Sequence, residues 1–170
     1  DIEVESDIGK GTTFRIKLKF RVTSDDNNDE HNQAMKIEAY KKLNYNGKKI
    51  LLVEDDEFNA EVMKELLTEV GIDVEIAPNG RNGISRLKER EAGYYSIVFM
   101  DIRMPGIDGY ETTRQIRRNQ RDDLKKIPII AMTAEAFSND VKMAVDAGMN
   151  GHIAKPVDLD CLKAVLDDWL

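Results

Sequence analysis

The sequence predicts an α/β protein built on a doubly wound, five-stranded parallel sheet. Short runs rich in Val, Ile and Leu alternate with longer amphipathic segments from residue 48 onward. Such alternation is typical of parallel strands that are joined by crossover helices. Polar residues of related chemistry follow directly after four of these runs, and open α/β sheets carry their sites at the carboxyl ends of strands.

The five expected strands cover residues 48–53, 72–77, 95–100, 127–132 and a short stretch around residue 153. Residues 72–77 alternate apolar and polar side chains, whereas residues 48–53, 95–100 and 127–132 end in apolar runs. The five expected helices carry apolar residues at helical spacing, and they cover residues 59–70, 79–91, 108–118, 138–147 and 159–169. Residues 119–126 are expected to form a charged loop. Strands connected in this way favour the order 2-1-3-4-5, a flavodoxin-like arrangement whose crevice lies beside strands one and three.

A short hairpin is expected at the N-terminus. Residues 2–8 and 12–20 flank a Gly-Lys-Gly turn signal, and the second segment alternates apolar and polar side chains. This pattern predicts two antiparallel strands. Because two strands alone are marginal in water, we expect residues 1–20 to be the remnant of a larger domain.

A linker is expected between the hairpin and the sheet. Residues 23–32 are rich in Ser, Asp, Asn, Glu and His, with almost nothing to bury. Residues 34–43 fit a short helix. The sequence therefore predicts a linker over residues 21–46 and a main domain over residues 47–170.

The composition limits the classes of function. The formal net charge is −7 over 170 residues, whereas nucleic-acid binding needs clustered Lys and Arg, so we expect no nucleic-acid partner. No apolar run approaches membrane-spanning length and no signal peptide is visible, so we expect no membrane contact by this chain. The single cysteine, Cys161, fits a reducing compartment. These features predict a cytoplasmic domain and leave open a membrane anchor in a missing N-terminal region of the parent protein.

Polar side chains follow four of the expected strands. Glu54 and Asp55 follow the first strand, and Asp101 follows the third, just before a Pro/Gly turn. Thr133 follows the fourth strand and Lys155 follows the fifth. Because these strand ends meet at one edge of a parallel sheet, we expect the side chains to lie together. Each also has an ordinary alternative role, such as an Asx turn for the aspartate, a turn hydroxyl for the threonine and a surface position for the lysine.

Together these side chains predict a site that holds a divalent cation and moves a phosphoryl group. Mg²⁺ prefers hard oxygen ligands, which Glu54, Asp55 and Asp101 supply. A carboxylate can attack phosphorus to form an acyl phosphate, and the transition state of that transfer needs nearby positive charge and hydrogen-bond donors. Lys155 and the hydroxyl of Thr133 are the candidates for this role.

Taken in order, these motifs resemble the response-regulator receiver domain, over roughly residues 48–170. The motifs that carry the resemblance are Glu54-Asp55, Asp101-Ile-Arg-Met-Pro105-Gly-Ile-Asp-Gly109, Thr133-Ala134 and Lys155-Pro156. Each motif alone is weak, but their combination and order are specific.

The resemblance implies roles for the individual residues. Asp101 is the implied phosphoacceptor, and Glu54, Asp55, Asp101 and the backbone carbonyl of Arg103 are the implied ligands of Mg²⁺. Thr133 is the implied switch residue.

Lys155 is the implied reader of the phosphate. The Lys155-Pro156 bond is expected to favour a cis form that aims the lysine. The family usually has Tyr or Phe three positions before this lysine, where this chain has His152. The favoured interpretation is that His152 only fills the same space, and the alternative is an aromatic switch that is altered or pH-sensitive.

The resemblance also implies partners. A receiver takes its phosphoryl group from the phosphodonor domain of a histidine kinase and passes it, or a conformational signal, to a histidine phosphotransfer domain. We expect such a partner to contact Phe58 and Ala60 on the first helix of the main domain, together with the loop after Pro156.

The N-terminal segment carries a second resemblance. The run from Glu5 to Phe14, Glu-Ser-Asp-Ile-Gly-Lys-Gly-Thr-Thr-Phe, is similar to the last glycine box and final strand of histidine-kinase ATP-binding domains. This resemblance implies that residues 1–20 are the end of such a domain and that the parent is a hybrid sensor histidine kinase. The earlier nucleotide-binding boxes and the His-containing part are absent from the chain. We therefore expect it to support only its own aspartate phosphorylation.

Two other classes of function remain open. A receiver-like interaction module that takes no phosphate is one, and the complete set of site residues argues against it. An aspartate-nucleophile phosphatase is the other, but it needs a second Asp two residues after the nucleophile, where this chain has Arg103. Treatment with a small acyl-phosphate donor and Mg²⁺ distinguishes the three, because a stable adduct, no reaction or turnover would result.

Overall fold

The structure, a computed structural model, describes residues 2–7, 9, 11–17, 35–134 and 138–170. The chain divides into two compact units, Asp1–Ala34 and Met35–Leu170. Most of the predicted linker, and the predicted end of the hairpin at residues 18–20, lie outside the described residues. Within the described part of the chain, no helix is long and apolar enough to span a membrane.

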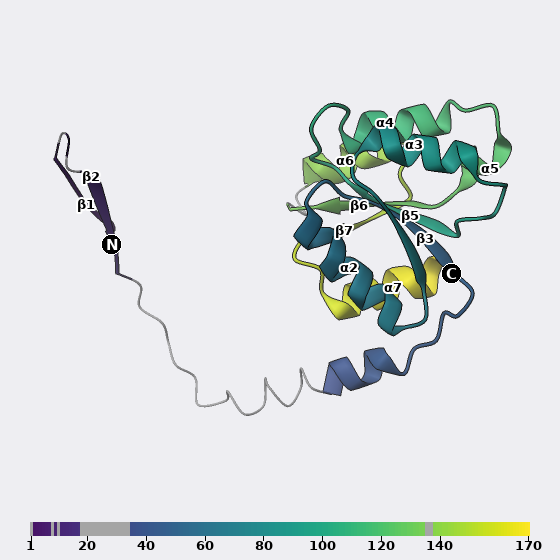
Figure 1. Ribbon diagram of the computed structural model, residues 1–170, viewed down its shortest axis with the longest axis horizontal. Helices are drawn as coiled ribbons and strands as arrows, with labels where there is room; N and C mark the ends of the chain where they lie inside the picture. The colour runs from purple at the N-terminus through teal and green to yellow at the C-terminus, as the bar shows by residue number, and fades with distance from the viewer. Residues whose placement is uncertain (1, 8, 10, 18–34, 135–137) are drawn as a thin grey trace. The chain divides into compact units, whose positions relative to one another are not determined.

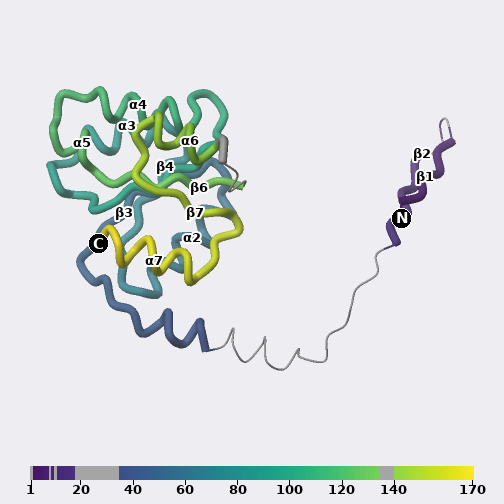
Figure 2. Tube along the Cα trace, turned by 180° about the vertical axis from the view of Figure 1, so that it is seen from behind, coloured from purple at the N-terminus to yellow at the C-terminus, as the bar shows by residue number. Residues whose placement is uncertain are grey.

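The larger unit is built on a parallel sheet of five strands, in the order β4-β3-β5-β6-β7. The strands are β3 (Lys49–Val53), β4 (Asp73–Ala77), β5 (Ile97–Asp101), β6 (Ile129–Thr133) and β7 (Gly151–Ala154). In chain order this is 2-1-3-4-5, so the predicted doubly wound, flavodoxin-like sheet is confirmed. The path of the chain through the sheet can be followed in Figures 1 and 2.

Helices cover both faces of this sheet. The five predicted helices are present as α2 (Glu57–Glu69), α3 (Gly80–Glu89), α4 (Gly109–Arg117), α6 (Ser138–Ala147) and α7 (Leu159–Trp169). Figure 1 shows α3, α4 and α6 on one face and α2 and α7 on the other. Four helices begin at an Asp or Asn whose side chain accepts a hydrogen bond from a first-turn backbone N–H, namely Asp56, Asn79, Asp108 and Asp158.

Alternate residues of each central strand pack into different layers of the core. On β3, Leu51 and Val53 pack with the layer of α3, α4 and α6, whereas Ile50 and Leu52 pack with the layer of α2 and α7. All four are fully buried. This two-sided burial explains why the strands are continuous apolar runs, and it leaves the strand ends as the place for polar groups.

One predicted loop is partly helical. Residues 119–126 were expected to form a charged loop, but the structure has a short helix, α5 (Asp122–Lys126), in its second half. Acids lie in its first turn and lysines in its last, which suits the helix dipole. Its single apolar residue, Leu124, is buried in the core and anchors the turn.

The compact unit begins twelve residues before the predicted boundary at residue 47, because residues 35–46 pack against it. Residues 35–41 are helical, and Tyr40 is only 3% exposed. Its hydroxyl donates to the carbonyl of Leu66 on α2 at 3.1 Å. The Tyr45 hydroxyl donates to Asp167 on α7 at 2.5 Å, and its backbone N–H donates to the carbonyl of Val70 at 2.8 Å. The second half of the predicted linker is thus part of the domain.

The smaller unit contains an antiparallel hairpin of β1 (Ile2–Asp7) and β2 (Gly11–Ile16). Ile2 pairs with Ile16 and Val4 pairs with Phe14, which places four apolar side chains on one face. All four are more than half exposed. An amphipathic hairpin with an uncovered apolar face is what a piece of a larger sheet would present.

We predict that Tyr40→Ala lowers the free energy of unfolding of the larger unit by about 3 kcal/mol, because it leaves a cavity between the 35–41 helix and α2. Ile37→Ala is the matched control, since Ile37 lies on the same helix and is 43% exposed. Its effect should stay below about 0.5 kcal/mol. Urea unfolding followed by the fluorescence of Trp169, the single tryptophan, measures both. Equal, small effects would show that residues 35–46 are a linker after all.

Candidate functional site

Five of the predicted site residues lie at one edge of the sheet. Asp101 is the last residue of β5 and Thr133 is the last residue of β6, whereas Glu54 and Lys155 directly follow β3 and β7. Asp55 is the next residue after Glu54. Because the strands are parallel, their carboxyl ends bring together residues that are distant in the sequence. The pair of Lys155 and Glu54 shows this, since the two residues are 101 positions apart.

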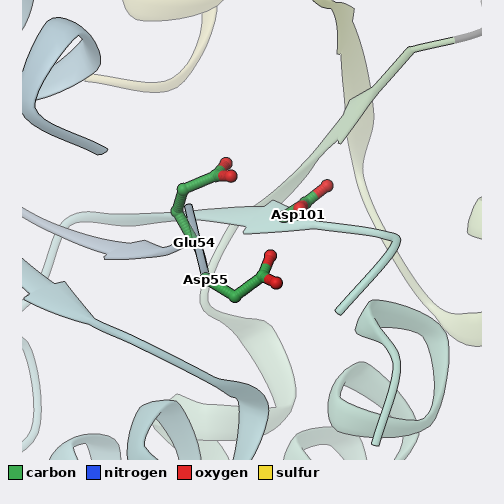
Figure 3. A group of neighbouring side chains, drawn as sticks. All are labelled: Glu54, Asp55 and Asp101. Carbon is green, nitrogen blue, oxygen red and sulfur yellow. The ribbon is translucent and has the colours of Figure 1, made fainter. Parts of the chain in front are cut away.

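Three carboxylates form the centre of this site. Glu54 and Asp101 are 3% and 6% exposed, and Asp55 is exposed. One carboxylate oxygen from each lies within 4.8 Å of the others, a spacing that suits a shared metal ion. Figure 3 shows the three side chains gathered at the ends of β3 and β5. Oxygen ligands at this spacing, from two buried carboxylates and one exposed carboxylate, fit a hard divalent cation.

Lys155 offsets part of the charge of the two buried carboxylates. Its ammonium nitrogen lies 2.6 Å from Oε2 of Glu54 and 3.1 Å from Oδ1 of Asp101. The same Oδ1 accepts a hydrogen bond from the backbone N–H of Arg103 at 3.3 Å. The Lys155-Pro156 peptide bond is cis, as the sequence favoured.

The carboxyl group of Glu54 is only partly satisfied. Burial raises its pKa, the hydrogen bond from Lys155 lowers it, and the nearby charge of Asp101 raises it, so that the net shift is upward. The nearby side chain of Asn59 also lowers this pKa, but no described residue donates a hydrogen bond of good geometry to the buried Oε1 atom. A buried carboxylate oxygen without a donor is costly, and a bound cation would satisfy it. The residues present therefore fit a divalent ion.

The structure places Thr133 and Arg103 beside this centre, and it places His152 within β7. Thr133 is 3% exposed, and its hydroxyl donates to Asp140 Oδ2 at 3.3 Å. His152 lies exposed on β7, three residues before Lys155. The side chain of Arg103 is exposed and its Nη2 lies 3.8 Å from Asp140 Oδ2. Sequence reasoning missed Asp140, because an acid in the first turn of a helix is common and its tertiary contact leaves no local signal.

An apolar cavity of about 180 Å³ lies beside the site. Glu54 and Lys155 line it on the polar side, and its apolar lining comes from Phe58, Val62, Met63, Met132, Pro156 and Val157. Phe58 is 76% exposed on the first turn of α2. Ala60, which was expected beside Phe58 as a partner contact, is 3% exposed, so that expectation was wrong. The helix turns Ala60 toward the core and leaves Phe58 in solvent.

Comparisons with known proteins agree with this geometry. The response regulator receiver domain family matches residues 50–167. The chain is 38% identical over 124 residues to the osmosensing histidine protein kinase SLN1 of Saccharomyces cerevisiae, with 71% of this chain and 10% of that protein covered. It is 36% identical over 123 residues to hybrid signal transduction histidine kinase A of Dictyostelium discoideum, with 72% and 6% covered. The chain therefore spans a tenth or less of the length of these curated relatives.

Two solved structures extend the comparison. The receiver domain of sensor histidine kinase PA1611 from Pseudomonas aeruginosa, described with a magnesium ion in its active site cleft, has a TM-score of 0.64 and 37% identity, over 72% of this chain and 97% of that one. A co-crystal structure from S. cerevisiae holds the phosphotransfer protein Ypd1 and the receiver domain of Ssk1. It matches with a TM-score of 0.63 and 28% identity, over 72% of this chain and 88% of that one.

The family match covers most of the chain, the sheet has the expected strand order, and the acidic, hydroxyl and ammonium groups meet at one edge. The chain therefore belongs to the response regulator receiver domain family and is a phosphorelay receiver of the kind found in hybrid histidine kinases.

Proposed function

We propose that this receiver accepts a phosphoryl group on Asp101, with Mg²⁺ held by Glu54, Asp55, Asp101 and the backbone carbonyl of Arg103. The observation that carries the proposal is the convergence of three carboxylates and one ammonium group at the carboxyl end of the sheet. The magnesium ion described in the related PA1611 receiver supports it. The orphaned Oε1 of Glu54 supports it independently, because a cation would supply the partner that the described residues do not.

The transfer is a displacement at phosphorus. A carboxylate oxygen of Asp101 attacks the phosphorus of a phosphohistidine, a P–O bond forms and the P–N bond breaks. The bonding pair stays on the imidazole nitrogen, which takes up a proton, and Asp101 becomes an acyl phosphate. Asp101 is prepared for this attack, because Lys155 and the Arg103 N–H hold Oδ1 in a fixed orientation.

The neighbouring groups stabilise the added charge. Mg²⁺, when bound, offsets the negative charge of the three carboxylates and of the phosphoryl oxygens. Lys155 already lies 3.1 Å from Asp101 Oδ1 and is placed to contact a phosphoryl group there. Thr133, at the end of the adjacent strand, is the hydroxyl donor to a phosphoryl oxygen. We assign the switch role to Thr133 and to His152, which is exposed on β7.

We propose that the phosphohistidine of the partner reaches Asp101 over α2 and the loop after Pro156. Phe58 is 76% exposed there and Val62 is 43% exposed. Both line the apolar cavity beside Lys155. A small apolar patch next to the reacting carboxylate suits a transient interface. The receiver of Ssk1, a relative by structure, is described in complex with the phosphotransfer protein Ypd1, which supports a partner of this class.

The parent protein is, in this proposal, a hybrid sensor histidine kinase. Residues 1–20 would be the C-terminal end of its ATP-binding domain. Residues 21–34 would link that domain to the receiver, which would begin near residue 35. The phosphodonor would be the histidine-containing domain of that kinase. Support comes from the uncovered apolar face of the hairpin and from the kinases among the curated relatives.

We predict that Asp101→Asn abolishes the gain of one phosphoryl group from a small acyl-phosphate donor with Mg²⁺, because the amide is isosteric but not nucleophilic. Asp146→Asn is the matched control, since Asp146 is exposed on α6, and it should be labelled like the unaltered chain. Intact-mass analysis counts the phosphoryl groups. Full labelling of the Asp101→Asn variant would show that Asp101 is not the phosphoacceptor. Absence of labelling in the unaltered chain would favour the interaction module that takes no phosphate.

We predict that phosphorylation requires a divalent cation and that Asp55→Ala weakens Mg²⁺ binding by about tenfold or more, because loss of a residue that only supports a metal ligand already costs about 10- to 100-fold. Isothermal titration calorimetry measures the affinity, and labelling in excess chelator measures the requirement. Lys155→Ala is the control, because Lys155 contacts carboxylates and should not weaken Mg²⁺ binding. Undiminished labelling in chelator, or a large loss of affinity in the lysine variant, would reject this assignment of roles.

We predict that Phe58→Ala weakens binding to a histidine phosphotransfer protein about tenfold, as removal of an aromatic interface anchor does. Val145→Ala is the control, because Val145 is 65% exposed on α6, and it should leave the affinity unchanged. Titration of the isotope-labelled chain with yeast Ypd1 locates the interface by amide shifts. Shifts confined to α6, with none around Phe58 or Pro156, would place the partner elsewhere.

A further inference from the structure

One carboxylate outside the metal cluster contacts residues on two sides of the site. Asp140 lies in the first turn of α6, and its side chain is 20% exposed. Its Oδ2 atom accepts a hydrogen bond from the hydroxyl of Thr133 at 3.3 Å and lies 3.8 Å from Nη2 of Arg103. Thr133 ends β6, next to the tip of β5, and Arg103 follows Asp101 by two residues. Asp140 therefore connects the two segments that flank the phosphoacceptor.

The bond from Thr133 to Asp140 competes with the proposed function of the hydroxyl. A threonine hydroxyl has one hydrogen to donate, so while it donates to Asp140 it cannot donate to a phosphoryl oxygen on Asp101. In the structure it donates to Asp140. If Thr133 contacts the phosphoryl group after transfer, this bond stabilises the unphosphorylated state alone, and phosphorylation has to break it.

We propose that Asp140 is a positioning residue that holds Thr133 in its resting orientation and thereby weakens the binding of a phosphoryl group at Asp101. The inference rests on the proposed function of Asp101 and Thr133. Asp140 lies outside the cluster of three carboxylates, and it acts through Thr133. The ordinary alternative is an acid that only stabilises the first turn of α6 through the helix dipole.

Two substitutions separate the hydrogen bond from the charge. Asp140→Asn removes the charge but keeps an oxygen that accepts from Thr133, whereas Asp140→Ala removes both. The probe is beryllofluoride with Mg²⁺, a mimic of the phosphoryl group, and its dissociation constant is measured by calorimetry. We expect the Asp140→Ala variant to bind about three- to tenfold more tightly than the Asp140→Asn variant, the factor that one lost hydrogen bond contributes.

A double-mutant cycle shows whether Asp140 acts through Thr133. In a Thr133→Ala background, the ratio of affinities between the Asp140→Ala and Asp140→Asn variants should fall to about one, because the donor is gone. Asp146→Ala, on the same helix, controls for the general loss of negative charge and should change the affinity less than about twofold. Asp140→Ser, whose short side chain suits a helix start, provides a second truncation if the Asp140→Ala variant folds poorly.

The outcomes distinguish the two proposals. If the unaltered chain binds no beryllofluoride in the presence of Mg²⁺, the proposed function of Asp101 fails. If the unaltered chain binds and the three Asp140 variants bind equally, Asp140 only stabilises α6 and the positioning role is overturned. A ratio that persists in the Thr133→Ala background would also overturn it, since the effect would then not pass through the threonine.

Discussion

The balance of charge between Lys155 and two buried carboxylates is the interaction on which the site depends. Glu54 and Asp101 are almost fully buried, and burial alone penalises their charged forms. The ammonium group of Lys155, at 2.6 Å and 3.1 Å, compensates them from a different strand. The ends of β3, β5 and β7 are therefore joined by charge as well as by the hydrogen bonds of the sheet. Removal of Lys155 would leave both buried carboxylates without their cationic partner.

The fold brings these groups together, although their burial lowers the stability of this part of the domain. Both faces of the sheet are filled with apolar side chains, so polar groups gather where the strands end. There, Glu54 Oε1 receives no hydrogen bond from the residues that the structure describes, although most of the buried polar atoms of folded proteins have one. Sites of chemistry are where such departures from ideal packing are expected. The orphaned oxygen is thus better explained by a ligand than by the needs of folding.

The sequence was informative where local pattern decides structure. Asp101 at the tip of a buried strand was predictable, because an apolar run and the turn after it are both local signals. The burial of Tyr40 was not predictable, because its contact with α2 is a tertiary contact and its flanking sequence is polar. The short helix around Leu124 was not predictable either. The burial of Leu124 in the core stabilises a helix in this charged segment, and that burial is a tertiary contact. The contact of Asp140 with Thr133 joins α6 to β6 through side chains, and no residue spacing in the sequence predicts it.

The division of the helices into two layers has a consequence for assembly. Phe58 and the cavity beside it belong to α2, which packs on the same face of the sheet as α7. Asp140 belongs to α6, which covers the opposite face together with α3 and α4. A protein bound over α2 and a second protein bound over α6 would be separated by the thickness of the sheet. The two flanks of the site are therefore built by different layers of helices, and a substitution at Asp140 leaves the surface over α2 unaltered.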